Sequence, residues 1–166
     1  MSEEEYYGKY GRLKLKENEV LIREGMLKLP SSPEERPFLI GGKCKSCGDV
    51  SFPRRHFCPK CSSETKEFPF GSFAEVFTYT IVYQAGMGIK TPYIVAMVNF
   101  PDINDPGLAV VCRIADCPIE DIKIGMKVEL IIDRVRSTFI GGLAEMFGMP
   151  GESIVGYCYR PVKGVK

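Results

Sequence analysis

The chain has 166 residues, with 22 lysines and arginines against 21 aspartates and glutamates, and seven cysteines. Hydrophobic residues make up 45% and charged residues 26%, which is typical of a soluble globular protein and excludes a disordered tail, a collagen-like fibre and a coiled coil. No apolar run approaches the roughly 20 residues of a membrane helix, and the start of the chain is acidic where a secretory signal would be basic. We therefore expect a cytoplasmic protein. Its net charge of +1 gives no general attraction to nucleic acid or lipid.

The first 37 residues are charged and favour helix. Ser2 and Glu5 have the spacing of a capping box, and Asn18 could cap a second helix that continues to about Leu29. The apolar stripe of this second helix is only partial. Three prolines then interrupt the chain before residue 38. The pattern predicts an N-terminal helical segment over residues 1–37.

Four of the cysteines form two C-x-x-C pairs. Cys44 and Cys47 make the first pair, and Cys58 and Cys61 make the second after ten intervening residues. Each tight turn presents two thiolates, so folding can place four sulfurs around one tetrahedral ion. Four thiolates favour Zn²⁺, with iron as the redox-active competitor, although redox-active dithiols or coincidence would also account for the pattern. The spacing predicts a structural zinc ribbon over residues 38–70, closed to catalysis because no coordination position is open.

The rest of the chain, residues 71–166, has the character of β-structure. The five expected strands are residues 73–84, 93–100, 108–114, 127–135 and 153–160. Five antiparallel strands, with a break between the third and the fourth, predict a five-stranded Greek-key barrel of the OB type and a mainly β protein. An apolar stripe from Phe73 to Tyr83 alternates with period two, and we expect it to face the barrel core rather than to stack nucleic-acid bases.

The sequence contains no convincing catalytic group. His56 is the only histidine, and it lies between the two cysteine pairs with the wrong spacing for a metal ligand. The remaining cysteines, Cys112, Cys117 and Cys158, are expected to be small core residues. The carboxylates show no pair that could act as acid and base. The chain is therefore expected to catalyse nothing by itself.

Two stretches are candidate contact surfaces. Between residues 41 and 61 there are five basic residues and one acid, and Arg54, Arg55 and Lys60 could meet phosphates or an acidic partner; a simply solvated face is the alternative. Residues 139–151 combine four glycines with large apolar side chains, which favours an interface or gating loop. The apolar residues of this expected loop are Phe139, Leu143, Met146, Phe147 and Met149.

Several short motifs occur together in a family order. They are C-x-x-C-G at 44–48, Phe52-Pro53-Arg54, Cys58-Pro59-x-Cys61, Val76-x-Thr78-Tyr79-Thr80, Pro92-Tyr93 and Gly125-x-x-Val128. Over residues 38–160 this order resembles the zinc-ribbon/OB-fold acyl-CoA-associated proteins, long catalogued as a domain of unknown function. Members are partners of thiolase-superfamily enzymes in archaeal thiolase–synthase assemblies, steroid side-chain aldolases and two-protein thiolases. In size and in its 139–151 segment, the chain is most similar to the small subunits of benzoylsuccinyl-CoA thiolases of anaerobic aromatic degradation.

The resemblance implies a non-catalytic, zinc-containing subunit of a heteromeric thiolase-type enzyme that acts on acyl-CoA thioesters. The catalytic subunit would supply the cysteine nucleophile, and this chain would be required for activity, docking on that subunit and helping to shape or gate its CoA site. Arg54, Arg55 or Lys60 would approach the CoA phosphates, a placement that comes from charge and not from a family motif. The alternatives are a single-stranded nucleic-acid-binding protein and a purely structural scaffold. The N-terminus and the 139–151 segment lie outside the family core.

Overall fold

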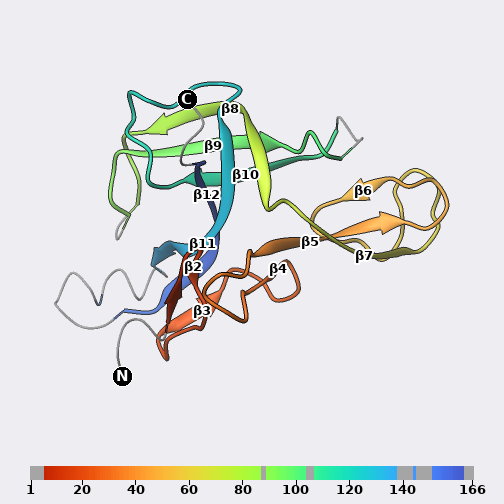
Figure 1. Ribbon diagram of the computed structural model, residues 1–166, viewed down its shortest axis with the longest axis horizontal. Coiled ribbons are helices and arrows are strands. Elements are labelled where there is room, and N and C mark those ends of the chain that lie inside the picture. The colour runs from red at the N-terminus through yellow and green to blue at the C-terminus, as the bar shows by residue number, and fades with distance from the viewer. Residues whose placement is uncertain (1–5, 87–88, 104–106, 138–143, 145–150, 163–166) are drawn as a thin grey trace.

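The computed structural model describes residues 6–86, 89–103, 107–137, 144 and 151–162. Its strands form an eight-stranded sheet and a smaller four-stranded sheet. Figure 1 shows that most strands of the larger sheet gather into a barrel, while the smaller sheet extends to one side of it. Within the described residues, no helix is long and apolar enough to cross a membrane.

The barrel consists of five strands: β8 (Phe73–Val82), β9 (Tyr93–Asn99), β10 (Ala109–Ile114), β11 (Lys127–Ser137) and β12 (Ser153–Pro161). They pair in the ring β8-β9-β10-β12-β11, and β11 closes the ring by pairing with β8. All five strands were expected at these places. The expectation that every pair is antiparallel was wrong, because β10 and β12 run parallel. A closed ring of five strands cannot be antiparallel throughout, because four antiparallel pairs leave the fifth pair parallel. Here the parallel pair is β10 with β12.

The smaller sheet is built around one central strand. β5 (Phe38–Cys44) pairs antiparallel with β4 (Leu27–Lys28), β6 (Val50–Ser51) and β7 (Thr65–Phe70). The close approach of these strands explains Gly41 and Gly42, because an added Cβ at either position would lie within about 3.0 Å of neighbouring atoms. The sheet spans the region expected to form the ribbon, and the division of the chain at residues 37 and 70 stays a prediction.

The N-terminal helical segment was not found: residues 6–37 contain no helix. They form the short strands β1 (Tyr7–Gly8), β2 (Gly11–Arg12), β3 (Glu19–Leu21) and β4. Asn18 does not cap a helix; its side-chain amide donates to the carbonyl oxygen of Gly151 at 2.9 Å, and β3 pairs parallel with β12. Tertiary pairing with the barrel has therefore overridden a weak helical pattern. The expected cap at Ser2 and Glu5 lies outside the described residues.

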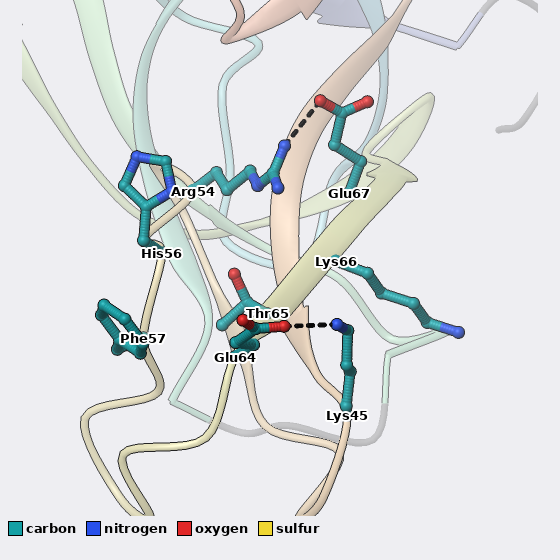
Figure 2. A pocket seen from close by; sticks show the side chains of 8 residues that line it. All are labelled: Lys45, Arg54, His56, Phe57, Glu64, Thr65, Lys66 and Glu67. Atoms are coloured by element: carbon teal, nitrogen blue, oxygen red, sulfur yellow. Dashed lines mark hydrogen bonds and ion pairs between the residues drawn. The ribbon is translucent and has the colours of Figure 1, made fainter.

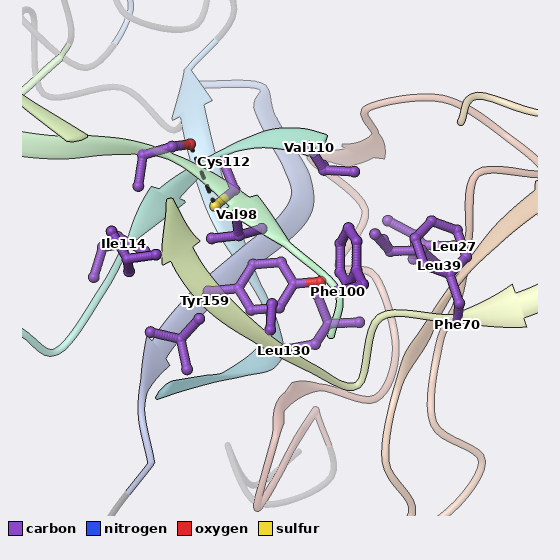
Figure 3. Close-up of a cluster of buried hydrophobic side chains, with 14 of the residues drawn as sticks. Leu27, Leu39, Phe70, Val98, Phe100, Val110, Cys112, Ile114, Leu130 and Tyr159 are labelled. Atoms are coloured by element: carbon purple, nitrogen blue, oxygen red, sulfur yellow. Dashed lines mark hydrogen bonds between the residues drawn. The ribbon is translucent and has the colours of Figure 1, made fainter. Parts of the chain in front are cut away.

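A continuous core joins the barrel to the smaller sheet (Figure 3). Tyr159 is fully buried, and its hydroxyl donates to the carbonyl oxygen of Gly71 at 2.6 Å. Phe70 packs edge-on against Phe52 and Phe100, with ring centroids 5.5 and 5.0 Å away. Because Phe52 and Phe70 belong to the ribbon region and Phe100 to the barrel, these contacts fix the two sheets against each other.

The apolar stripe of β8 is not the barrel core, so that expectation was wrong. Ala74 and Val76 face the core, whereas Phe77 is 59% exposed and Tyr83 is 66% exposed. A shift in the pairing of β8 with β9 between Val76 and Thr78 marks a β-bulge, which disturbs the simple alternation of faces. In addition, β11 pairs only with residues 73–75 of β8, so the rest of that strand lies beyond the closed part of the barrel.

Candidate metal centre and the charged surface of the ribbon

The two cysteine pairs meet in space, as their spacing predicted. Cys44 ends β5 and Cys47 lies in the following turn, while Cys58 and Cys61 come from the loop between β6 and β7. All four Sγ atoms lie within 4.8 Å of one another. The pairs Cys44–Cys61, Cys47–Cys61 and Cys47–Cys58 are 3.4, 3.5 and 3.6 Å apart. The ribbon thus collects its four thiols at a single point.

This cluster fits a tetrahedral metal ion. Four zinc–sulfur bonds of about 2.3 Å in a tetrahedron place the sulfurs about 3.8 Å apart, close to the spacings seen here. The backbone N–H groups of Ser46 and Cys47 point at Cys44 Sγ at 3.4 and 3.5 Å, and that of Lys60 points at Cys58 Sγ at 3.4 Å. Gly48 adopts a φ of 76°, a left-handed conformation that suits glycine and completes the first turn. Such N–H donors stabilise thiolates, the form that binds metal.

The electrostatic environment of the four cysteines favours binding of a cation by the cluster. Hydrogen bonds from the backbone and side chain of Ser63 lower the pKa of Cys61 to about 6, and the backbone N–H of Cys47 lowers that of Cys44. The backbone N–H of Asp49 also lowers the pKa of Cys47, but the neighbouring sulfurs of Cys44 and Cys61 outweigh it and raise the value to about 12. Without a cation, four thiolates this close would repel one another and could not all be ionised. A divalent cation bound between them would offset that repulsion.

The basic residues of the ribbon are mostly paired with acids. Lys45 contacts Glu64 and Arg54 contacts Glu67, each at 2.6 Å, on the wall of a cavity of about 610 Å³ (Figure 2). Lys60 pairs with Asp49. The expected excess of positive charge is therefore largely neutralised, because Glu67 in β7 and Glu64 just before it follow the 41–61 window in the chain and return beside it. Of the three expected contact residues, Arg55 is exposed and makes no ion pair within the described residues.

The remaining candidate groups do not form a catalytic set. His56 is exposed in the ribbon, beside the Lys45–Glu64 pair. Cys112 and Cys158 are buried in the barrel as expected, and burial raises the pKa of Cys158 to about 12 and that of Cys112 still further. Cys117 is half-buried. Among the described residues, His56 is thus separate from the barrel thiols, and no nucleophile is paired with a base.

The expected interface or gating loop lies outside the described residues. This applies to Phe139, Leu143, Met146, Phe147 and Met149, so their role stays a prediction.

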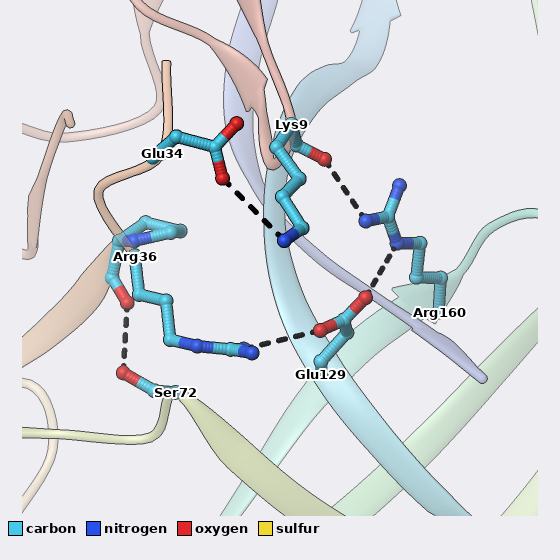
Figure 4. Close-up of polar contacts among 7 residues, drawn as sticks. Lys9, Glu34, Arg36, Ser72, Glu129 and Arg160 are labelled. Carbon is cyan, nitrogen blue, oxygen red and sulfur yellow. Dashed lines mark hydrogen bonds and ion pairs between the residues drawn. The ribbon is translucent and has the colours of Figure 1, made fainter. Parts of the chain in front are cut away.

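A buried ionic cluster was missed by the sequence reasoning (Figure 4). The carboxylate of Glu129 accepts hydrogen bonds from Arg36 Nη1 at 3.1 Å and from Arg160 Nε at 3.0 Å. Arg160 also donates to the carbonyl oxygen of Lys9 at 2.9 Å. The sequence signal that could have revealed this cluster is the position of Glu129 between the apolar residues Val128 and Leu130 of β11. A charge that is buried at such a position needs an oppositely charged or hydrogen-bonding partner.

Comparison with known proteins places the chain in a family. Residues 34–67 match a family model described as the ChsH2 rubredoxin-like zinc ribbon domain, and residues 69–133 match the ChsH2 C-terminal OB-fold domain. A DUF35 domain-containing scaffold protein of Methanocaldococcus jannaschii is 33% identical over 134 residues, covering 78% of this chain and 86% of the relative. The chain belongs to the DUF35 family. This confirms the family that the motifs indicated, with its zinc ribbon and OB-fold domains.

Other DUF35 relatives extend the comparison. A scaffold protein of Pyrococcus furiosus is 34% identical over 131 residues, covering 77% of this chain and 86% of that protein. The benzoylsuccinyl-CoA thiolase subunit BbsA of Thauera aromatica is 28% identical over 101 residues, 60% of this chain and 67% of the subunit. Among solved structures, the Ltp2-ChsH2(DUF35) aldolase matches with a TM-score of 0.52 at 21% identity, over 75% of this chain and 84% of the matched chain. This last likeness supports the fold.

Proposed function

We propose that this DUF35 protein is a non-catalytic, zinc-containing subunit of a heteromeric thiolase-type enzyme that acts on acyl-CoA thioesters. In this proposal Cys44, Cys47, Cys58 and Cys61 hold one Zn²⁺. All four ligands come from the chain, so the ion has no open position and serves to stabilise the ribbon. The protein would dock on a catalytic subunit and help to shape or gate the CoA site of that subunit.

The observation that carries the proposal is the similarity along most of the chain to proteins that assemble with others. The relatives of Methanocaldococcus jannaschii and Pyrococcus furiosus are named scaffold proteins and match 78% and 77% of the chain, and BbsA is named a subunit of a thiolase. The absence of a paired nucleophile and base among the described residues agrees with a role in which another chain performs the chemistry.

The three basic residues proposed to contact the CoA phosphates differ in whether they are already paired with an acid. Arg54 and Lys60 already hold Glu67 and Asp49, so a phosphate would have to compete with those carboxylates. Arg55 is exposed and has no such partner among the described residues, and its planar guanidinium suits bidentate binding of a phosphate. We therefore propose Arg55 as the main phosphate contact, with Arg54 and Lys60 as secondary contacts.

Co-expression tests the proposal. The chain is produced together with a thiolase-superfamily catalytic subunit from the same organism, and the complex is assayed for thiolysis of acyl-CoA thioesters. We expect co-purification, about one zinc ion per copy of this chain, and loss of most activity when this chain is omitted. Full thiolase activity from the large chain alone would show that this protein is at most a scaffold. Arg55→Ala should raise the KM for the CoA substrate, while Lys66→Ala serves as the control.

The nucleic-acid alternative gains one observation from the structure. Phe77, Tyr79 and Tyr83 are exposed and could stack bases. Single-stranded nucleic acid also needs a basic groove beside the aromatic rings, but residues 73–83 contain no lysine or arginine. Oligonucleotide binding that weakens steeply with salt would favour this alternative over the acyl-CoA subunit.

A further inference from the structure

Among the described residues, no strand pairs with the second half of β8 on the side away from β9. Val76 is the last residue whose backbone is bonded on the side away from β9: its N–H donates to Met126 and its carbonyl accepts from Gly125, at 3.0 and 2.8 Å. From Phe77 onward, the described residues provide pairing only from β9. Phe77 to Thr80 are four consecutive exposed residues, so this stretch is open to solvent on both faces. In Figure 1 it runs along the outer margin of the barrel.

This edge lacks the usual features that prevent pairing with another chain. Natural edge strands are protected by charged residues, prolines or shortness. Between Glu75 and Lys90 the chain has no charged residue and no proline. Residues 77–83, Phe-Thr-Tyr-Thr-Ile-Val-Tyr, are all aromatic or β-branched, the residue types that favour strands. The bulge lies at the start of the free stretch and leaves the remainder regular.

The pairing with β9 shows which backbone groups face outward. Along an antiparallel pair, residues alternate between those that bond to the partner strand and those that face away. Val76 faces away from β9 and lies opposite Val98. Tyr79 and Ile81 lie opposite Ala96 and Ile94, which have the same parity as Val98 in β9. The backbone groups of Tyr79 and Ile81 therefore point out of the sheet, ready to bond to a further strand.

We propose that a second copy of this chain pairs with this edge, β8 against β8, antiparallel about Thr80. In this register Tyr79 of each copy lies opposite Ile81 of the other, so the two outward-facing residues exchange both backbone bonds. Thr80 lies opposite Thr80, and Phe77 lies opposite Tyr83. Aromatic residues opposite β-branched or aromatic residues, and threonine opposite threonine, are the favourable cross-strand pairs.

The second copy suits this edge because the strand is complementary to itself. An uncharged edge selects an uncharged strand, and β8 itself meets that requirement without any like-charge contact. Pairing about a single central residue is two-fold symmetric, so the contact closes as a dimer and leaves no edge for further growth. The solvent-facing residues of the adjoining strands, among them Met97 and the 57% exposed Val111, extend the apolar surface beside it.

The oligomeric state tests the proposal. Sedimentation of the zinc-loaded chain, over an about hundredfold range of concentration, should show a monomer–dimer equilibrium. Thr80→Lys places two ammonium groups opposite each other and should raise the dissociation constant about tenfold or more. Val20→Lys adds the same charge to a 40% exposed residue of β3, which lies at the far end of the sheet order from β8, and should leave the dimer intact. A wild-type monomer at every concentration, or a Thr80→Lys variant that dimerises normally, would overturn the proposal.

Cross-linking tests the register itself. Thr80→Cys should form a disulfide between two copies under mild oxidation, because directly opposite Cβ atoms lie about 5 Å apart. Thr78→Cys, on the same face of the same strand, would lie opposite Val82 and should not cross-link above the wild-type background. Equal cross-linking of both variants would exclude the Thr80 register. A dimer that persists in Thr80→Lys would show that the two copies do not pair through β8. If backbone amides of β8 are protected from hydrogen exchange only when the catalytic subunit is present, that subunit and not a second copy binds this edge.

Discussion

At the residue scale, the cysteines differ by the groups around them. Backbone N–H groups in the ribbon donate to the sulfurs of Cys44 and Cys61 and lower the pKa of both thiols. Cys112 and Cys158 lie in apolar strands, where burial favours the neutral thiol and raises the pKa of Cys158 to about 12. The same side chain is therefore prepared for metal binding in one sheet and acts as a small hydrophobic residue in the other.

The first prediction concerns the metal. Cys58→Ser should reduce bound zinc from about one ion per chain to a small fraction of that, because three thiolates hold the ion much less tightly than four. Elemental analysis of the purified protein measures this. Cys117→Ser removes a half-buried thiol outside the cluster and should leave the zinc content unchanged. Full zinc occupancy in Cys58→Ser would contradict the proposed ligand set.

The second prediction concerns Glu129. Glu129→Gln keeps the size of the side chain but removes the charge that Arg36 and Arg160 share, so two guanidinium groups lose their common partner. We expect the free energy of unfolding to fall by about 2 kcal/mol, below the range for fully buried pairs because Arg36 is partly exposed. Urea denaturation measures the change.

An exposed ion pair provides the control for Glu129. Glu64→Gln breaks the contact with Lys45 on the ribbon surface, where both side chains remain well solvated. The urea midpoint of this variant should match the wild type. Equal effects of the two substitutions would show that burial of Glu129 contributes nothing beyond an ordinary surface contact.

At the element scale, the length of a strand decides whether the sequence reveals it. The five barrel strands have six or more residues each, which is long enough for the alternation of faces to be visible, and all five were predicted. The strands of residues 6–37 have two or three residues and show no period. They form where another strand offers an edge, since β2 pairs with β11, β3 with β12 and β4 with β5, and these pairings are not visible in the local sequence. The helical pattern around Asn18 was therefore misleading.

The third prediction concerns the connection from β7 to β8. Gly71 has a φ of 84°, and an added Cβ would lie 3.0 Å from the hydroxyl oxygen of Tyr159 and 3.2 Å from a methyl group of Leu39. Gly71→Ala should therefore cost about 2 kcal/mol or more of unfolding free energy, from backbone strain and crowding together. Thermal denaturation followed by circular dichroism measures the loss.

Gly125 separates the two contributions. Its φ of 81° is nearly the same, but an added Cβ there would meet no atom within 4 Å. Gly125→Ala should cost only the backbone strain, about 1 kcal/mol. If Gly71→Ala and Gly125→Ala shift the melting temperature equally, Tyr159 and Leu39 do not restrict the turn.

At the scale of the whole molecule, the surface charge of the ribbon differs from the charge of the sequence window that forms it. The ribbon is basic within the 41–61 window of the sequence, but Glu64, just before β7, contacts Lys45, and Glu67, within β7, contacts Arg54. The meeting of the four cysteines was predicted from their spacing, since each pair is local and a shared metal ion would bring the two pairs together. The ion pairs depend on the register between β5 and β7, which no single sequence window contains. The gathering of the four cysteines was thus predictable from the sequence, whereas the surface charge of the ribbon was not.

The fourth prediction is that the ribbon and the barrel unfold together. Phe70 is 7% exposed and connects Phe52 of the ribbon to Phe100 of the barrel. Phe70→Ala should lower the unfolding free energy by about 3 kcal/mol, because it leaves a cavity where the two cores meet. It should also separate zinc release from barrel unfolding, two events that we expect to coincide in the wild type. A zinc-sensitive dye and circular dichroism, recorded in one urea titration, measure the two events. Phe57→Ala removes a 63% exposed ring from the same ribbon and should leave both transitions together at the wild-type midpoint. If zinc release and barrel unfolding already occur at different urea concentrations in the wild type, the shared core does not couple the two sheets.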